Sequence, residues 1–144
     1  MTVAAILKHK GHEVARVAPG ATIAEAARLL HSKRIGALLV MDTAGQLLGI
    51  LSERDIVGSL AEYGVGTLEL TAAQLMTRDL KTATLGTTVE QAMGMMTEGR
   101  FRHLPVMDGD RLAGVVSIGD VVKARISDQE YEVDSLRAYV AGAT

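Results

Sequence analysis

The sequence carries one pattern of residues twice, and this repeat constrains the fold more than any other feature. Gly20–Asp42 aligns with Gly86–Asp108, and Leu47–Val57 aligns with Leu112–Val122, with identical or similarly apolar residues at most positions. A period of about 65 residues is too long for a solenoid unit and favours two copies of one supersecondary unit packed together. The 144 residues are enough to bury a core without disulfides or metals.

Each copy contains the same order of expected elements. Capping boxes at Thr22–Glu25 and Thr88–Gln91 each predict a helix start, and apolar residues at helical spacing follow both. Two short apolar runs separated by turn residues then predict a β-hairpin, after which a second helix begins. With a short lead-in strand the unit is β-α-β-β-α, so the chain falls in the α+β class. The expected second helices are Glu53–Leu60 and Ile118–Ile126, the lead-in strands Glu13–Val17 and Leu80–Thr84, and the hairpins Ala37–Met41 with Leu47–Leu51 and His103–Met107 with Arg111–Val116.

The boundaries follow from the repeat. We expect a single module over residues 1–144, with repeat one at about 3–61, a linker at about 62–71 and repeat two at about 72–126. The start of each repeat reads as a short helix, Thr2–His9 and Ala72–Met76. A C-terminal helix at about 128–141 is predicted to start with the capping box Ser127–Glu130. Its apolar residues lie on one helical face, so it should dock on its own domain or on a partner.

Composition excludes several classes of protein. The chain has no cysteine, so disulfides, thiolate metal sites and cysteine nucleophiles are absent, and a reducing cytoplasmic compartment is expected. The net charge is −2 with both signs interspersed, which disfavours nucleic acid. No apolar run approaches the length of a membrane span. The four histidines are too scattered to specify a metal, and no catalytic motif is present, so we expect no enzyme, no catalytic residue and no catalytic cofactor.

A Gly-x-x-Ser-x-x-Asp motif ends the hairpin of each copy, at Gly49–Asp55 and Gly114–Asp120. Its residues permit two interpretations. Ser at the N-cap and Asp three residues later form a helix cap, which alone explains both residue types. The same turn also offers free backbone N–H groups to a phosphate, and a carboxylate that can accept hydrogen bonds from a ribose diol. The motif is therefore either a helix cap or part of a nucleotide site.

The second hairpin begins with a basic segment that the first hairpin lacks. Arg102 and His103 stand where the first copy has Gly36 and Ala37, and Pro105 should leave the neighbouring strand edge open. Both side chains are candidates for phosphate binding or for a solvated face. The two motifs should therefore differ in charge and in preferred ligand.

The doubled motif and the run Arg100–Val106 together resemble a tandem pair of cystathionine-β-synthase (CBS) domains, the Bateman module. The chain is similar to the stand-alone bacterial type, in which the pair is the whole protein. The resemblance implies two repeats related by pseudo-twofold symmetry, followed by a C-terminal helix. It also implies clefts between the repeats that bind adenine nucleotides such as AMP, ATP or NAD(H).

The resemblance also implies roles for particular residues. Asp55 and Asp120 would bind ribose. Phosphate would be bound by the motif serines and the basic side chains near them, namely Ser52, Ser117, Arg54, Arg102 and His103. No residue is expected to bind a metal.

For the whole protein, the resemblance implies a regulatory sensor that reports energy or redox state to a regulated protein in trans. A homodimer is expected, and the methionines Met93, Met95 and Met96 would suit either its interface or the chain's own core. The alternative is a non-catalytic dimeric scaffold that binds no small molecule, in which both motifs act only as caps.

Overall fold

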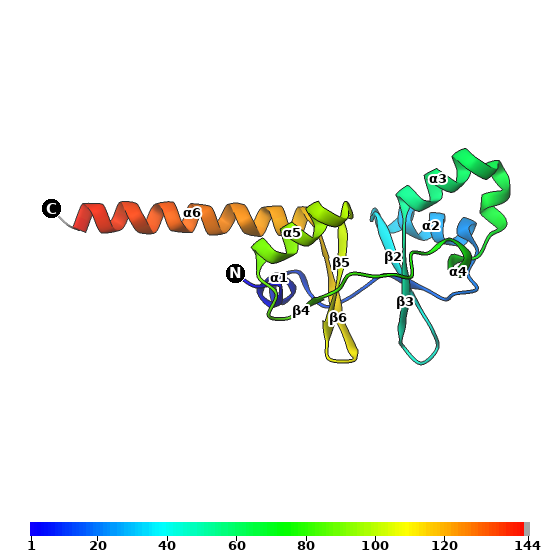
Figure 1. The fold of residues 1–144 in the computed structure, drawn as a ribbon, viewed down its shortest axis with the longest axis horizontal. Coiled ribbons are helices and arrows are strands. Elements are labelled where there is room, and N and C mark those ends of the chain that lie inside the picture. Colours follow the sequence, from blue (N-terminus) through cyan, green and yellow to red (C-terminus); the bar gives the residue numbers. More distant parts are fainter. Residues whose placement is uncertain (143–144) are drawn as a thin grey trace. The chain divides into compact units, whose positions relative to one another are not determined.

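The computed structural model describes residues 1–142 and divides into two compact units (Figure 1). Glu13–Leu80 forms one, which we call the first-repeat unit. Met1–His12 joins the chain from Lys81 onward to form the other, the second-repeat unit. Each unit contains one three-stranded sheet with helices. The expected α+β class, with two matching sheets and a C-terminal helix, is confirmed.

The first-repeat unit has a short parallel strand pair and a hairpin in one sheet. β1 pairs parallel to β2, which pairs antiparallel to β3. Aliphatic side chains from the sheet and helices make its core, including Ile23, Leu38, Val40 and Leu51. Its elements are β1 (Arg16–Val17), α2 (Ile23–Lys33), β2 (Ala37–Met41), β3 (Leu47–Ser52), α3 (Glu53–Tyr63), the 3-10 helix η1 (Gly64–Glu69) and α4 (Ala72–Leu75).

The second-repeat unit repeats this arrangement. β4 pairs parallel to β5, which pairs antiparallel to β6. The N-terminal helix contributes to the core of this unit, where Val3 and Leu7 join Val89, Leu104 and Val116. Its elements are α1 (Val3–Lys10), β4 (Ala83–Thr84), α5 (Val89–Gly99), β5 (His103–Asp108), β6 (Arg111–Ser117) and α6 (Ile118–Gly142).

The predicted capping boxes start α2 and α5. The Thr22 backbone N–H donates to Glu25 at 3.2 Å, and the Glu25 N–H donates to the Thr22 hydroxyl at 3.1 Å. Thr88 and Gln91 make the same pair of bonds at 2.9 and 3.1 Å. Each cap satisfies backbone groups that the first turn of a helix leaves unpaired, so these two helix starts were predictable from local sequence.

One helix start expected from the sequence was wrong. Ser127 does not start a new helix, because α6 runs without interruption from Ile118 to Gly142. No Gly or Pro lies between Asp120 and Ala141 to break the helix, and a residue that can cap does not force a break. The expected linker contains the 3-10 helix η1. Thr67 of η1 is buried, and its hydroxyl oxygen lies 2.7 Å from the hydroxyl oxygen of Ser59.

The methionines expected either at a dimer interface or in the chain's own core belong to the core region of the second-repeat unit. Met96 is 2% exposed, and Met93 and Met95 are partly buried against the same cluster. The interface interpretation is therefore wrong for Met96, because its side chain is already enclosed by its own chain.

The motif glycines allow a covering segment to approach the edge strand of each sheet. A Cβ on Gly49 would lie 2.6 Å from the Met76 sulfur and 2.7 Å from the Thr77 carbonyl oxygen. A Cβ on Gly114 would lie 2.8 Å from a Leu7 methyl carbon. Close packing thus explains the glycine of the motif, because a side chain at Gly49 would displace the Met76–Thr77 segment and one at Gly114 would displace the Leu7 side chain.

We predict that Gly49→Ala destabilises the protein by about 1–3 kcal/mol, since the new methyl group meets backbone that cannot move away freely. The matched control is Gly58→Ala in α3, where a Cβ meets nothing within 4 Å. That substitution should stabilise by about 0.5–1 kcal/mol because alanine favours a helix interior. Urea unfolding of both variants measures the difference, and equal stabilities would contradict the packing role of Gly49.

Candidate functional site

The first copy of the motif is a complete helix cap. The Asp55 backbone N–H donates to the Ser52 hydroxyl oxygen at 3.2 Å. The Ser52 backbone N–H and hydroxyl both donate to Oδ2 of Asp55 at 2.9 Å. These reciprocal bonds fix the turn from β3 into α3 and hold the half-buried carboxylate beside the helix start.

The second copy uses the same bonds. The Ser117 backbone N–H donates to Oδ2 of Asp120 at 2.8 Å, and the Asp120 N–H donates to the Ser117 hydroxyl at 3.1 Å. In both copies the cap uses one carboxylate oxygen, Oδ2. Among the described residues, no hydrogen bond is recorded to Oδ1 of Asp55 or of Asp120. The cap therefore leaves each carboxylate able to accept further hydrogen bonds.

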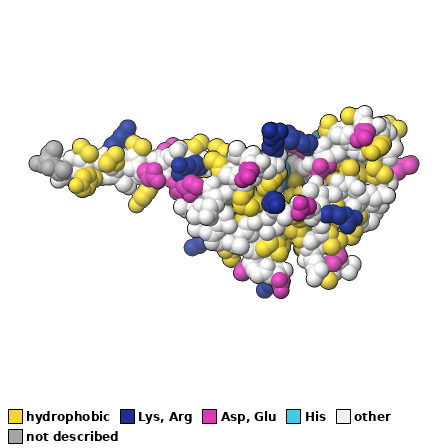
Figure 2. Space-filling model, in the orientation of Figure 1, with side chains coloured by type: hydrophobic (Ala, Val, Ile, Leu, Met, Phe, Trp, Pro, Cys, Tyr) yellow, Lys and Arg dark blue, Asp and Glu magenta, His cyan; other side chains and the backbone are white. Residues whose placement is uncertain are grey.

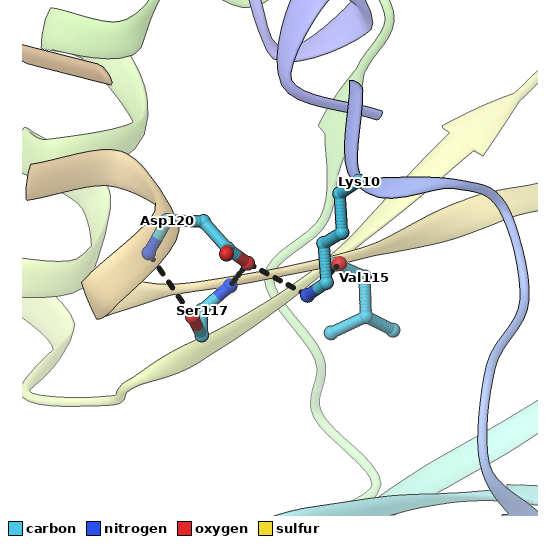
Figure 3. Close-up of polar contacts among 4 residues, drawn as sticks. All are labelled: Lys10, Val115, Ser117 and Asp120. Atoms are coloured by element: carbon cyan, nitrogen blue, oxygen red, sulfur yellow. Dashed lines mark hydrogen bonds and ion pairs between the residues drawn. The ribbon is translucent and has the colours of Figure 1, made fainter. Parts of the chain in front are cut away.

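Lys10 distinguishes the second motif from the first. From the end of α1 its ammonium donates to Oδ2 of Asp120 at 2.6 Å and to the Val115 carbonyl at 3.0 Å (Figure 3). In the described part of the chain, the Asp55 carboxylate has Ser52 as its bonded partner and no recorded ion pair. The two carboxylates therefore have different charge environments.

The ion pair changes the acidity of Asp120. Burial raises the pKa of its carboxyl group, but the hydrogen bond and charge of Lys10, with the bonds from Ser117, lower that pKa by more. The net pKa of Asp120 is below its ordinary value, so the group is ionised at neutral pH.

Arg102 and His103 lie at the second motif. His103 is the β5 residue opposite Ser117, and the Ile118 N–H donates to the Arg102 carbonyl at 2.8 Å. Arg102 is exposed and His103 is half-buried. Pro105 lies one residue before the part of β5 that pairs with β4. Because proline has no N–H, it cannot make the bond that Leu39, at the matching position of the first repeat, donates to the Ala15 carbonyl at 3.0 Å.

Small residues take these places at the first motif. Ala37 lies opposite Ser52, and the Glu53 N–H donates to the Gly36 carbonyl at 3.0 Å. Arg54 is exposed on the first turn of α3. Beside the first motif, α3 thus carries acidic Glu53 and basic Arg54. The second motif has the cations Lys10 and Arg102 as neighbours.

A hollow in the first-repeat unit brings two predicted site residues together. Arg54 and Asp55 line it with Leu70, Gln74 and Leu75, and its volume is about 770 Å³. Its lining combines the charged side chains of Arg54 and Asp55 with the apolar side chains of Leu70 and Leu75, which suits a ligand with both polar and apolar parts.

Two features escaped the sequence-based prediction. Lys10 lies outside the aligned segments of the two repeats, which begin at Gly20 and Gly86, so no matching position drew attention to it. Arg34 and Arg100 end α2 and α5 in left-handed backbone, with φ of 54° and 56°. Glycine or asparagine is the usual signal for such a helix end, and an arginine there gives none.

Within residues 1–142 no group of three or more His, Cys, Asp or Glu side chains is placed to hold a metal ion. The helices in this range include none with the length and apolar character needed to cross a membrane.

We predict that Lys10→Met lowers the free energy of unfolding at pH 7 by about 0.5–1 kcal/mol, the value of a partly exposed ion pair. A carboxylate with a lowered folded pKa stabilises the fold above its unfolded pKa of about 4. This contribution is lost as the pH falls through the folded value, so parent and variant should converge below pH 4. Thermal unfolding from pH 7 to 3 measures this.

The control is Lys8→Met, which removes an exposed charge from the same helix. It should match the parent throughout. A Lys10→Met difference that stays constant with pH would contradict the role of Asp120 as the partner.

Comparison with known proteins places this arrangement in a family. The family model described as CBS domain matches residues 6–62 and 72–127. The crystal structure of the CBS-domain containing protein ATU1752 from Agrobacterium tumefaciens is 45% identical, with a TM-score of 0.85 over 87% of this chain and 99% of that one. A structure of CBSX2 in complex with AMP is 28% identical, with a TM-score of 0.69 over 81% and 90%.

A curated relative is longer than this chain. The mitochondrial CBS domain-containing protein CBSX3 of Arabidopsis thaliana is 35% identical over 125 residues, which are 84% of this chain and 61% of that protein. The chain thus spans about three fifths of this relative. Both motifs, both sheets and both helix caps fall within the two matched segments, and the chain belongs to the CBS domain family as a tandem pair.

Proposed function

We propose that the protein is a non-catalytic regulatory module that binds adenine nucleotides and passes the signal to a separate protein. In this proposal Asp55 and Asp120 accept hydrogen bonds from the ribose diol. The phosphates lie by the helix starts at Ser52 and Ser117. The ligands are AMP, ATP or NAD(H), which report energy or redox state.

One observation carries this proposal. In each motif the cap uses Oδ2 of the aspartate and leaves Oδ1 without a recorded partner among the described residues. Capping and diol binding are therefore compatible at the same carboxylate. The AMP complex of the related CBSX2 supports adenine nucleotides as the ligand class.

The two motifs should differ in ligand. At Asp120 the ammonium of Lys10 already occupies the carboxylate at 2.6 Å, so a ribose there competes with an ion pair. Once displaced, Lys10 would join Arg102 and His103 as a donor to phosphate. We therefore assign the more highly charged nucleotide to the second motif, and a ligand with less phosphate charge to the first, where Arg54 is the nearby cation.

The alternative is a dimeric scaffold without a small-molecule ligand. It is favoured by the completeness of both caps, since the bonds of Ser52 and Ser117 account for the motif residues without any nucleotide. The two functions differ in one measurable property, the effect of nucleotides on stability.

We expect AMP, ADP, ATP, NAD or NADH to raise the midpoint of thermal unfolding by several degrees. A ligand at about 100 times its Kd stabilises by about 2.7 kcal/mol. In Asp55→Asn and Asp120→Asn the side-chain oxygen can still accept the cap hydrogen bond, but no second oxygen remains to accept one from the ribose. Each should lower affinity by about tenfold for the ligand of its own motif.

The matched control is Glu25→Gln, which makes the same change at the cap of α2, outside both motifs. It should leave the nucleotide-induced shift unchanged. Absence of a shift with every nucleotide would support the scaffold instead, and equal shifts in all three variants would reject the ribose role of the aspartates.

We further predict that Arg102→Gln weakens ATP binding about fivefold and AMP binding less, because the removed charge faces the longer phosphate chain. Isothermal titration calorimetry measures both. Arg111→Gln removes an equal charge at the other end of β6 and should change neither affinity. Equal losses for the two nucleotides would place Arg102 away from the outer phosphates.

A further inference from the structure

The helix α6 carries a row of exposed apolar side chains along its length. The helix extends beyond the other elements of the second-repeat unit (Figure 1), and hydrophobic side chains appear along its visible face (Figure 2). Several are at least two-fifths exposed: Val122 40%, Ile126 50%, Val133 47%, Leu136 64% and Val140 59%. Residues 129–142 are all exposed, so this unit does not cover them.

Five of the exposed apolar residues of α6 follow a heptad pattern, whereas the exposed Tyr131 and Tyr139 lie outside its a and d positions. Ile126, Val133 and Val140 recur at intervals of seven and occupy a positions, while Val122 and Leu136 occupy d positions. Together they form one stripe along the helix, which we call the α6 stripe. Val121 and Ala124, which α6 buries in its own core, lie on a different face. The helix thus packs one face within the unit and leaves a coiled-coil seam unpartnered.

We propose that the α6 stripe packs against the same stripe of a second copy of this chain, as a parallel, in-register, two-stranded coiled coil. β-branched residues at a with leucine at d favour two parallel strands. The pattern on α6 has Ile126, Val133 and Val140 at a, with Leu136 at d. This inference rests on α6 alone and does not depend on nucleotide binding.

The charges beside the stripe favour this orientation. In a parallel pair, a g residue faces the e residue of the next heptad on the other helix. Glu132 at g of one copy then faces Arg137 at e of the other, and Arg125 at g faces Glu130 at e. Both contacts join opposite charges, and each occurs twice in a symmetric dimer. Arg125 also bonds Glu90 of its own chain at 2.6 Å, so the Glu132–Arg137 pair is the cleaner determinant.

The remaining d position fixes the register. Gln129 lies between Ile126 and Val133 in the seam, and in-register pairing places it opposite Gln129 of the other copy, where the two amides can bond to each other. A polar residue in a seam lowers stability but selects one alignment. The exposed end of α6 does not have to nucleate a helix by itself, because Val121 and Ala124 already pack the first turns of α6 into the core of the unit.

The first test measures association of the full chain by sedimentation equilibrium. Val133→Glu places a charge in the seam and should raise the dimer dissociation constant by about a hundredfold. Ser135→Glu adds the same charge on the opposite face, also exposed, and should leave it unchanged. A parent chain that is monomeric, or a Val133→Glu chain that remains fully dimeric, would overturn the proposal.

The second test fixes orientation and uses the absence of cysteine in the chain. In a parallel in-register dimer, Gln129→Cys brings two thiols together at the seam and should form an intermolecular disulfide under mild oxidation. Ser135→Cys should not. Arg137→Glu should weaken the dimer, and adding Glu132→Arg to it should restore association. Cross-linking at 135 but not at 129, or failure of the charge swap to restore association, would overturn the parallel register.

Two other occupants of the stripe give distinct results. If α6 folds back onto its own chain, or binds a lipid surface, the Gln129→Cys chain forms no intermolecular cross-link at position 129. Co-sedimentation with vesicles of phosphatidylglycerol and phosphatidylcholine separates these two cases, and either result rejects the coiled coil.

Discussion

The reciprocal hydrogen bonds between Ser52 and Asp55, and between Ser117 and Asp120, organise each repeat. They end the hairpin, start the following helix and orient a carboxylate at one point of the chain. A cap normally satisfies only the orphan groups of a helix. Here the cap also holds the aspartate side chain through Oδ2 and leaves Oδ1 without a cap bond. This arrangement would pre-organise the carboxylate for a ligand. Under the proposed function, the residues that stabilise each helix start are also the residues that bind the ligand.

The duplication produces similar geometry with different electrostatics. Both sheets, both caps and both close approaches at Gly49 and Gly114 recur. Lys10 has no counterpart at the first motif, and Arg102 stands where the first repeat has a glycine. Because backbone geometry is shared, charge is the main property left to separate the two motifs. Divergence after duplication thus changed side chains around a constant frame.

Features set by short stretches of sequence were predictable. The capping boxes at Thr22 and Thr88 gave two helix starts, because neighbouring residues alone satisfy them. The Ser-x-x-Asp motifs likewise predicted the caps at the starts of α3 and α6, while the ligand-binding role of their residues stays a prediction. Long-range packing was not predictable in this way. No local signal links Lys10 to Asp120, which is 110 residues away in the sequence. The capping box at Ser127 lies within α6, and the helix continues through it.

The placement of α1 has a consequence for how the chain assembles. The first-repeat unit is continuous, whereas the second is built from both sides of it, with Val3 and Leu7 inserted among residues beyond Lys81. During synthesis the N-terminal helix emerges first but lacks its sheet until β6 has been made. The first repeat can fold on its own contacts in that interval, and the second must close a loop around it. The second repeat is therefore complete only after β6 has been made, and until then α1 lacks the core that covers Val3 and Leu7.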